Sequence, residues 1–136
     1  MHVFITDALV IDLETETWQC RGCKNDLGSA RKNYKSFLRV RPRNPQDIHA
    51  PIIDKNRYEF TFSPDPDWTR VVEYYCPHCA RQMEAEYLPP GHPPAYDIEL
   101  DIDALKAQWA DREALTEPSI GPAVVPPQHH HRKGGE

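Results

Sequence analysis

Short apolar runs, separated by turn residues and prolines, recur along most of this chain. Runs of this length that alternate with polar residues, or that are rich in β-branched and aromatic side chains, are typical of β-strands. The pattern predicts strands over residues 3–11 (as one or two short strands), 17–19, 34–41, 57–62, 68–75 and 82–87. It also predicts a polar turn over 24–28. Pro42 should limit the strand over 34–41, because proline cannot donate to a strand ladder.

One segment, residues 102–115, has the periodicity of a helix. Asp101 is placed to cap its first turn. Its apolar stripe is narrow and is interrupted at Arg112; it consists of Ile102, Leu105 and Trp109. A stripe this narrow favours a helix that docks on a surface over one that forms a core.

All four cysteines of the chain lie in two Cys-x-x-Cys pairs, Cys20 with Cys23 and Cys76 with Cys79, each beside a predicted strand. Thiolates three positions apart on a tight turn can face one cation, and two such turns supply the four soft donors that zinc prefers, at about 2.3 Å each. The intervening residues 24–75 form a long spacer, which is tolerated because loop-closure entropy grows slowly with length. The pattern predicts a structural Zn²⁺ bound by these four cysteines.

Three other interpretations of the cysteines compete with a zinc site. Two disulfides would suit a secreted protein, but the first residues have neither the basic region nor the unbroken apolar run of a signal peptide, so we expect a cytoplasmic protein under reducing conditions. A thioredoxin-like redox pair should open a helix, whereas both pairs lie beside strands. Unliganded buried thiols would leave the matched spacing unexplained. A closed four-cysteine shell also disfavours catalysis at the metal, because it has no open position for substrate.

The fold class that follows is mainly β with one short helix: a zinc-ribbon-like β domain with an extended, proline-rich C-terminal arm. We expect three parts: the zinc-ribbon-like domain over 1–88, an extended segment plus docking helix over 89–116, and a proline- and histidine-rich tail over 117–136. Fourteen prolines among the 136 residues confine helix to the gaps between them. Apolar runs are too short to cross a membrane, so no membrane partner is expected.

Charge is segregated along the sequence, although the net charge is only −5. Residues 21–43 carry eight basic side chains and a single acid, Asp26, whereas residues 73–117 carry ten acids and three bases. Either the two halves neutralise each other on a solvated face, or they form a surface for partners. An alternative function follows from the second interpretation: a zinc-ribbon nucleic-acid-binding protein that uses segment 21–43, with Tyr34 and Phe37 stacking on bases. The pI of about 5.8 speaks against nucleic acid.

Other candidate chemistry is weaker. His78 lies inside the second cysteine pair, but four thiols already complete the shell, so it is expected to be a bystander. Glu84 and Glu86 would share one face of a strand, and a solvated face is favoured over acid–base chemistry. The three histidines His129 to His131 would make a weak metal site in an extended tail. A free-standing hydrolase is the least favoured function.

The segment Trp68 to Cys79, then Glu84 to Glu86, the prolines that follow and Tyr96 to Asp101 together resemble the acetone carboxylase gamma subunit family. The resemblance implies a subunit of a large cytoplasmic ATP-dependent ketone carboxylase. Its partners would be hydantoinase-like large subunits, which use ATP, a divalent cation and bicarbonate in a hetero-oligomer. The small subunit of that family binds zinc and is structural, and motif matching makes Cys20, Cys23, Cys76 and Cys79 its ligands. The proline and histidine tail departs from some relatives and leaves the ketone open.

Overall fold

The N-terminal part of the chain folds into a four-stranded antiparallel sheet in the computed structural model, which describes residues 1–51, 54, 56–114 and 116. Its strands are β1 (His2–Phe4), β2 (Leu9–Asp12), β3 (Thr17–Cys20) and β4 (Asp26–Ser29), in that order across the sheet. The strands predicted over 3–11 and 17–19 are confirmed. The turn predicted over 24–28 is shorter than expected, because its second half forms β4 against β3.

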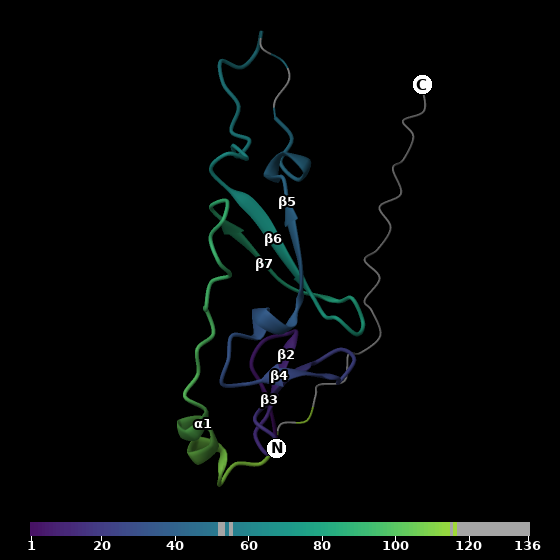
Figure 1. Cartoon of the computed structure of the whole chain (residues 1–136), viewed down its shortest axis with the longest axis vertical. Coiled ribbons are helices and arrows are strands. Elements are labelled where there is room, and N and C mark those ends of the chain that lie inside the picture. The colour runs from purple at the N-terminus through teal and green to yellow at the C-terminus, as the bar shows by residue number, and fades with distance from the viewer. Residues whose placement is uncertain (52–53, 55, 115, 117–136) are drawn as a thin grey trace, which may run out of the picture.

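A second antiparallel sheet, of three strands, lies beyond the first along the long axis of the molecule (Figure 1). It consists of β5 (Arg39–Arg43), β6 (Arg70–Tyr75) and β7 (Gln82–Leu88), with β6 in the centre. Arg41 lies opposite Glu73, and Glu73 opposite Ala85. The strands predicted over 68–75 and 82–87 are therefore confirmed, and with them the mainly β class.

Two strand predictions are wrong in whole or in part. The first half of segment 34–41 is a 3-10 helix, η1 (Tyr34–Phe37), because the side chain of Asn33 accepts a hydrogen bond from the backbone nitrogen of Lys35 and caps a tight turn. Strand β5 begins only at Arg39 and runs through Pro42, which is tolerated because β5 is an edge strand. Residues 57–62 form turns and bends rather than a strand.

The helix is shorter than predicted. Helix α1 covers Ile102–Trp109, and the side chain of Asp101 caps it by accepting a hydrogen bond from the backbone nitrogen of Ala104. A short 3-10 helix, η2 (Pro45–Asp47), follows β5. Leu115 and the tail over 117–136, with His129 to His131, lie outside the described residues. Within the described part of the chain, no helix has the length and apolar character needed to cross a membrane.

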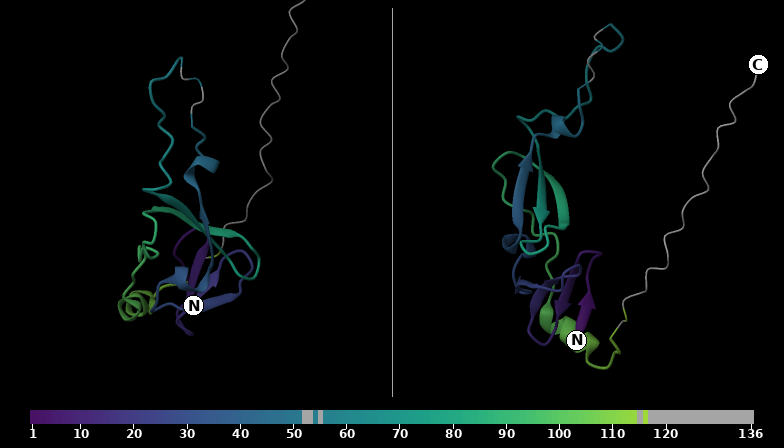
Figure 2. Two further views of the ribbon diagram at one scale, coloured as in Figure 1. Left: turned by 45° about the horizontal axis from the view of Figure 1, so that its top comes forward. Right: turned by 90° about the vertical axis from the view of Figure 1, so that its right-hand side faces the viewer.

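One hydrophobic core joins the two sheets and the helix. Trp18 of the first sheet and Tyr74 of the second belong to it, together with Tyr34 of η1 and Ile102 of α1. Helix α1 therefore docks on the core of its own chain. Ile102 is buried, and Leu105 and Trp109, the other two members of the predicted stripe, pack against the core. The residues between β7 and α1 run back along both sheets to bring the helix beside the first one (Figure 2).

Candidate metal centre

The two Cys-x-x-Cys turns have the same backbone conformation. In the first, the nitrogen of Lys24 donates to the carbonyl oxygen of Cys20 at 2.8 Å, and in the second the nitrogen of Ala80 donates to that of Cys76 at 3.0 Å. Lys24 and Ala80 both have positive φ, at 64° and 61°. Each turn joins two strands, β3 to β4 and β6 to β7. The two sheets thus present equivalent hairpin tips, each carrying a pair of thiols.

The tips meet so that the four sulfur atoms lie within 4.8 Å of one another. The Sγ atoms of Cys20 and Cys79 are 3.8 Å apart, as are those of Cys23 and Cys76. Four sulfurs bonded to one tetrahedral Zn²⁺ at about 2.3 Å would lie about 3.8 Å apart. All four cysteines are free thiols, and their separations exceed the ~2.05 Å of a disulfide bond. This arrangement can hold a metal ion such as Zn²⁺.

The four thiols differ in burial and in hydrogen bonding, and Cys20 and Cys23 therefore differ in pKa. Cys20 and Cys76 are buried, whereas Cys79 is exposed. Burial raises the pKa of Cys20 to about 12, and hydrogen bonds from Asn25 lower the pKa of Cys23 to about 6. A buried thiolate is costly unless a cation compensates it. A soft dication fits this donor set, since it favours thiolate at every position and its shell is closed by four sulfurs.

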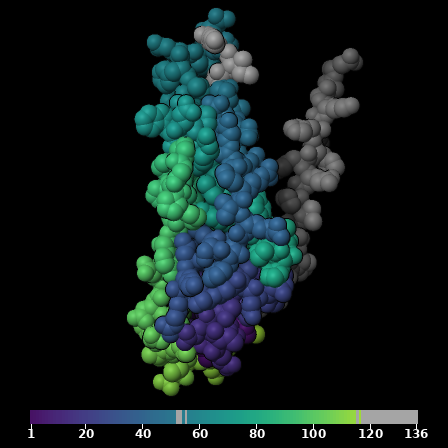
Figure 3. All heavy atoms as spheres, in the orientation of Figure 1, coloured from purple at the N-terminus to yellow at the C-terminus, as the bar shows by residue number. Residues whose placement is uncertain are grey.

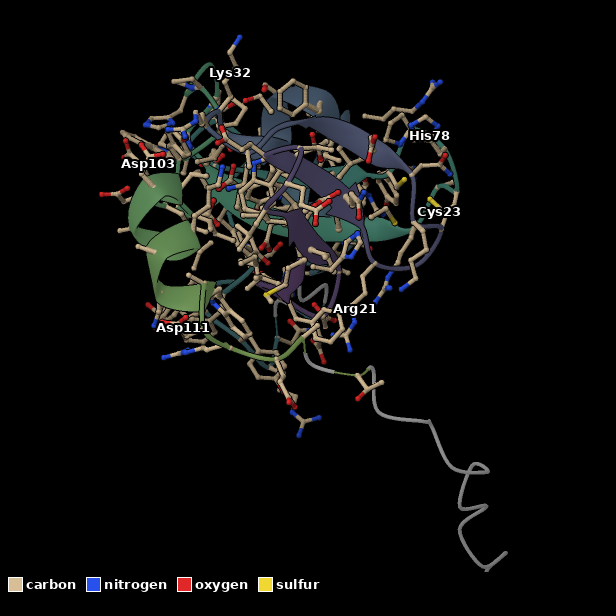
Figure 4. All side chains as sticks on the ribbon, turned by 90° about the horizontal axis from the view of Figure 1, so that it is seen from below. Arg21, Cys23, Lys32, His78, Asp103 and Asp111 are labelled. Carbon is tan, nitrogen blue, oxygen red and sulfur yellow. The ribbon has the colours of Figure 1, made fainter. Side chains whose placement is uncertain are left out.

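Contacts outside the sulfurs also hold the second turn against the first sheet. The Nε2 atom of His78 lies 3.2 Å from the carbonyl oxygen of Asp26, and the guanidinium of Arg81 donates to the carbonyl oxygen of Asp7 at 3.1 Å. His78 is not part of the four-sulfur cluster. Figure 4 shows Cys23 and His78 close together, on the side of the molecule opposite Asp103 of α1. Hydrogen bonds of the second turn to the first sheet therefore hold the two hairpin tips together in addition to any metal.

A second charged cluster, around Lys35, was missed by sequence reasoning. The ammonium group of Lys35 is buried and lies 2.8 Å from a carboxylate oxygen of Glu86, 3.0 Å from one of Asp97 and 3.0 Å from the carbonyl oxygen of Ala95. The hydroxyl of Tyr74 donates to Glu86 at 2.6 Å. Burial alone would raise the pKa of Glu86, but the bonds from Lys35, Tyr74 and the Ala95 nitrogen hold it below the usual value.

The solvated face expected for Glu84 and Glu86 is thus wrong for Glu86. The backbone of Ala95 and the side chain of Asp97, from the segment after β7, close over it. No local sequence signal predicts the burial of Glu86, because Lys35 and its two carboxylate partners are far apart in sequence. The run around Lys35 has the alternation typical of a half-exposed strand. The cluster joins η1, β6, β7 and the segment leading to α1.

Helix α1 is held by a third ionic group. The guanidinium of Arg31 lies 2.6 Å from carboxylate oxygens of both Glu16 and Asp103, and the ammonium of Lys106 lies 2.9 Å from Glu16. The hydrogen bonds from Arg31 and Lys106 lower the pKa of Glu16 to about 2. These contacts connect the first sheet's turns to the helix.

Several basic side chains of segment 21–43 make contacts within the molecule. Arg31 and Lys35 pair as described above, Arg43 lies 3.4 Å from Glu73, and Arg21 stacks on the ring of Phe4. Tyr34, which the nucleic-acid alternative needs for stacking on bases, is fully buried. Ion pairs within the chain neutralise Arg31, Lys35 and Arg43, and together with the burial of Tyr34 they speak against that alternative.

Two hairpin tips that bring four thiols to one point, each on its own antiparallel sheet, define a zinc-ribbon-like protein. The sequence comparison is more specific: the acetone carboxylase gamma subunit family matches residues 3–110, and the chain belongs to this family. The family resemblance drawn from Trp68 to Asp101 is thereby confirmed.

Two named proteins are similar to this chain. The chain is 50% identical over 107 residues to the acetophenone carboxylase beta subunit of Aromatoleum aromaticum, a match that covers 79% of this chain and 81% of that one. It is 28% identical over 97 residues to the acetone carboxylase gamma subunit of Xanthobacter autotrophicus, covering 70% of this chain and 54% of the relative. Both relatives are subunits of carboxylases that act on ketones, as their names state.

Proposed function

We propose that this chain is a non-catalytic, zinc-binding structural subunit of an ATP-dependent ketone carboxylase complex of the acetophenone or acetone type, in the cytoplasm. The observation that carries the proposal is the convergence of four thiols within 4.8 Å, a set that closes the shell of Zn²⁺ and leaves no coordination position for a substrate. Family membership supports the carboxylase assignment.

The proposed zinc joins the two sheets. Cys20 is the last residue of β3 in the first sheet and Cys23 follows it, whereas Cys76 and Cys79 follow β6 of the second sheet. One ion at this point closes the long loop 24–75, and the free energy of binding becomes free energy of folding, because the site does not exist in the unfolded chain. This role suits a chain whose apolar content is 39%, slightly low for a globular domain.

ATP, a divalent cation and bicarbonate would then be used by larger, hydantoinase-like partner subunits. Among the described residues, the four cysteines are the one group of three or more potential metal-ligating side chains whose donor atoms converge. The charged residues of the other two clusters form ion pairs within the chain, such as Lys35 with Glu86 and Arg31 with Glu16. The chain's contribution would be to assembly.

The test is to purify the complex with wild-type chain and with Cys79→Ser, and to measure zinc, assembly and carboxylation together. A structural role predicts that the variant lowers zinc content and the assembled fraction, while each assembled complex keeps its turnover. Turnover of ATP or ketone by the isolated chain would refute the proposal. So would a variant that retains zinc and full assembly but loses carboxylation.

A further inference from the structure

The described residues of the long connection between β5 and β6 (44–51, 54 and 56–69) project beyond the second sheet at the end of the molecule far from α1 (Figures 1 and 3). Residues 56–69, here called the aromatic arm, carry large side chains in solvent. Phe60 is 63% exposed, Phe62 81% and Trp68 78%. Single exposed apolar residues are ordinary on protein surfaces, but several large ones on one projection mark an interaction site.

The exposed rings are part of a shaped surface. Phe60 and Phe62 contact edge to face, with ring centroids 5.0 Å apart. Beside them lies a hollow of about 470 Å³, lined by His49, Ala50, Phe62, Ser63 and Pro64. Aromatic side chains beside a hollow are the anchors that protein interfaces most often use.

The arm is fixed at its base. The hydroxyl of Ser63 bonds to the carbonyl oxygen of His49, and the ring of His49 lies 2.7 Å from the hydroxyl of Tyr87 on β7. The carbonyl oxygen of Asp65 accepts from the backbone nitrogens of Trp68 and Thr69, each at 3.1 Å. A surface held in place before binding loses less conformational entropy when it binds.

Charge indicates the kind of partner. In the sequence, residues 54–69 carry four acids (Asp54, Glu59, Asp65 and Asp67) and two bases (Lys55 and Arg57), and Arg57 stacks on Tyr58. Acidic groups around apolar anchors complement an apolar groove with a basic rim. A second copy of the chain would bring an equally acidic arm, and arm-to-body contacts between copies would be heterologous, which produces rings or open filaments rather than a two-fold dimer.

We infer that the aromatic arm docks into an apolar groove, rimmed by lysine and arginine, on one of the larger subunits of the carboxylase complex. This rests on the proposed function. Phe62 and Trp68 are its anchors, and Glu59 and Asp67 face the basic rim.

The test measures binding of the zinc-loaded full chain to the assembled larger subunits. Phe62→Ala with Trp68→Ala should weaken binding by roughly 30-fold or more, as expected for truncated anchors. Tyr96→Ala, at a tyrosine that is 42% exposed but outside the arm, is the matched control and should change binding by less than about 2-fold. Glu59→Lys with Asp67→Lys should slow association. Zinc content and the circular dichroism spectrum should be unchanged in all variants, because the arm lies outside the core.

Each outcome is decisive. Arm variants that bind like wild type overturn the inference but leave the proposed function intact. Failure of the wild-type chain to bind the larger subunits refutes the proposed function, and the inference with it. A wild-type self-association, seen by sedimentation, that the arm variants abolish while they still bind the larger subunits would make the occupant a second copy and overturn the inference.

Discussion

The buried ion cluster at Lys35 gives the sharpest test of how the chain's parts are joined. Replacing Lys35 by Met keeps the apolar stem and removes the charge. The Lys35 side chain is 0% exposed, whereas those of Glu86 and Asp97 are 15% and 40% exposed. Removing one partner of a buried pair costs about 3–5 kcal/mol, because the remaining charge is left uncompensated. Asp97 can turn to solvent, so the loss should lie near the lower end, about 3 kcal/mol.

The assay is urea unfolding of the zinc-loaded chain, followed by tryptophan fluorescence, to which the buried Trp18 contributes together with Trp68 and Trp109. Lys35→Met should lower the transition midpoint with little change in slope, because the same surface is exposed on unfolding. The matched control is Lys32→Met, at an exposed neighbouring position, which should change the unfolding free energy by less than about 0.5 kcal/mol. Adding Glu86→Gln to Lys35→Met should recover part of the loss, because it removes the orphaned carboxylate.

The pH dependence of the unfolding free energy gives a second test of the cluster at Lys35. In the wild type the pKa of Glu86 lies below its usual value of 4.5, so its stabilising contribution is full above that value and is lost as pH falls through the folded pKa. Without Lys35, burial should raise the pKa of Glu86, and protonation then favours the folded state. The stability gap between wild type and Lys35→Met should therefore shrink as pH falls from 7 toward 4.5. A loss below about 1 kcal/mol at neutral pH, or a gap that widens on acidification, would refute the account of this cluster.

Two further predictions concern packing and the helix. A Cβ built on Gly28 would overlap the ring of Phe37, so Gly28→Ala should cost about 1–3 kcal/mol of unfolding free energy. The control, Gly22→Ala, should be nearly neutral, because the nearest neighbour of its Cβ is the flexible Arg81 side chain at 3.4 Å. Equal losses in the two variants would contradict the packing argument. Arg31→Gln should speed amide hydrogen exchange in α1, because the ion pairs of Arg31 with Glu16 and Asp103 hold the helix. Exchange in β6 and the zinc content should be unchanged. Equal acceleration of exchange throughout the chain would show that these ion pairs do not hold the helix.

Residue periodicity predicted the elements whose partners are near in sequence. Strands β1 to β3 and the β6–β7 hairpin follow from alternation and turn residues, and the capped helix from Asp101 and its stripe. The cluster of four thiols was predictable because the spacing within each cysteine pair is a local signal. Its geometry confirms that the two pairs converge.

The errors come from interactions that the sequence does not mark. Segment 34–41 alternates like a strand, but the Asn33 cap and the burial of Lys35 turn its first half into η1. Segment 57–62 has the alternation and aromatic content of a strand, but it pairs with no strand in the part of the chain that the structure describes, and its aromatic rings are exposed. Glu86 was assigned to solvent because nothing before it in sequence shows that Ala95 will cover it.

The most direct test of the central claim is X-ray absorption at the zinc edge of the purified complex, with the metal content of this chain determined in parallel. We expect one zinc ion per chain, coordinated by four sulfur atoms at about 2.3 Å, with that signal lost in Cys79→Ser. A shell with nitrogen or oxygen ligands, a chain that folds and assembles without metal, or cysteines recovered as disulfides would contradict the account.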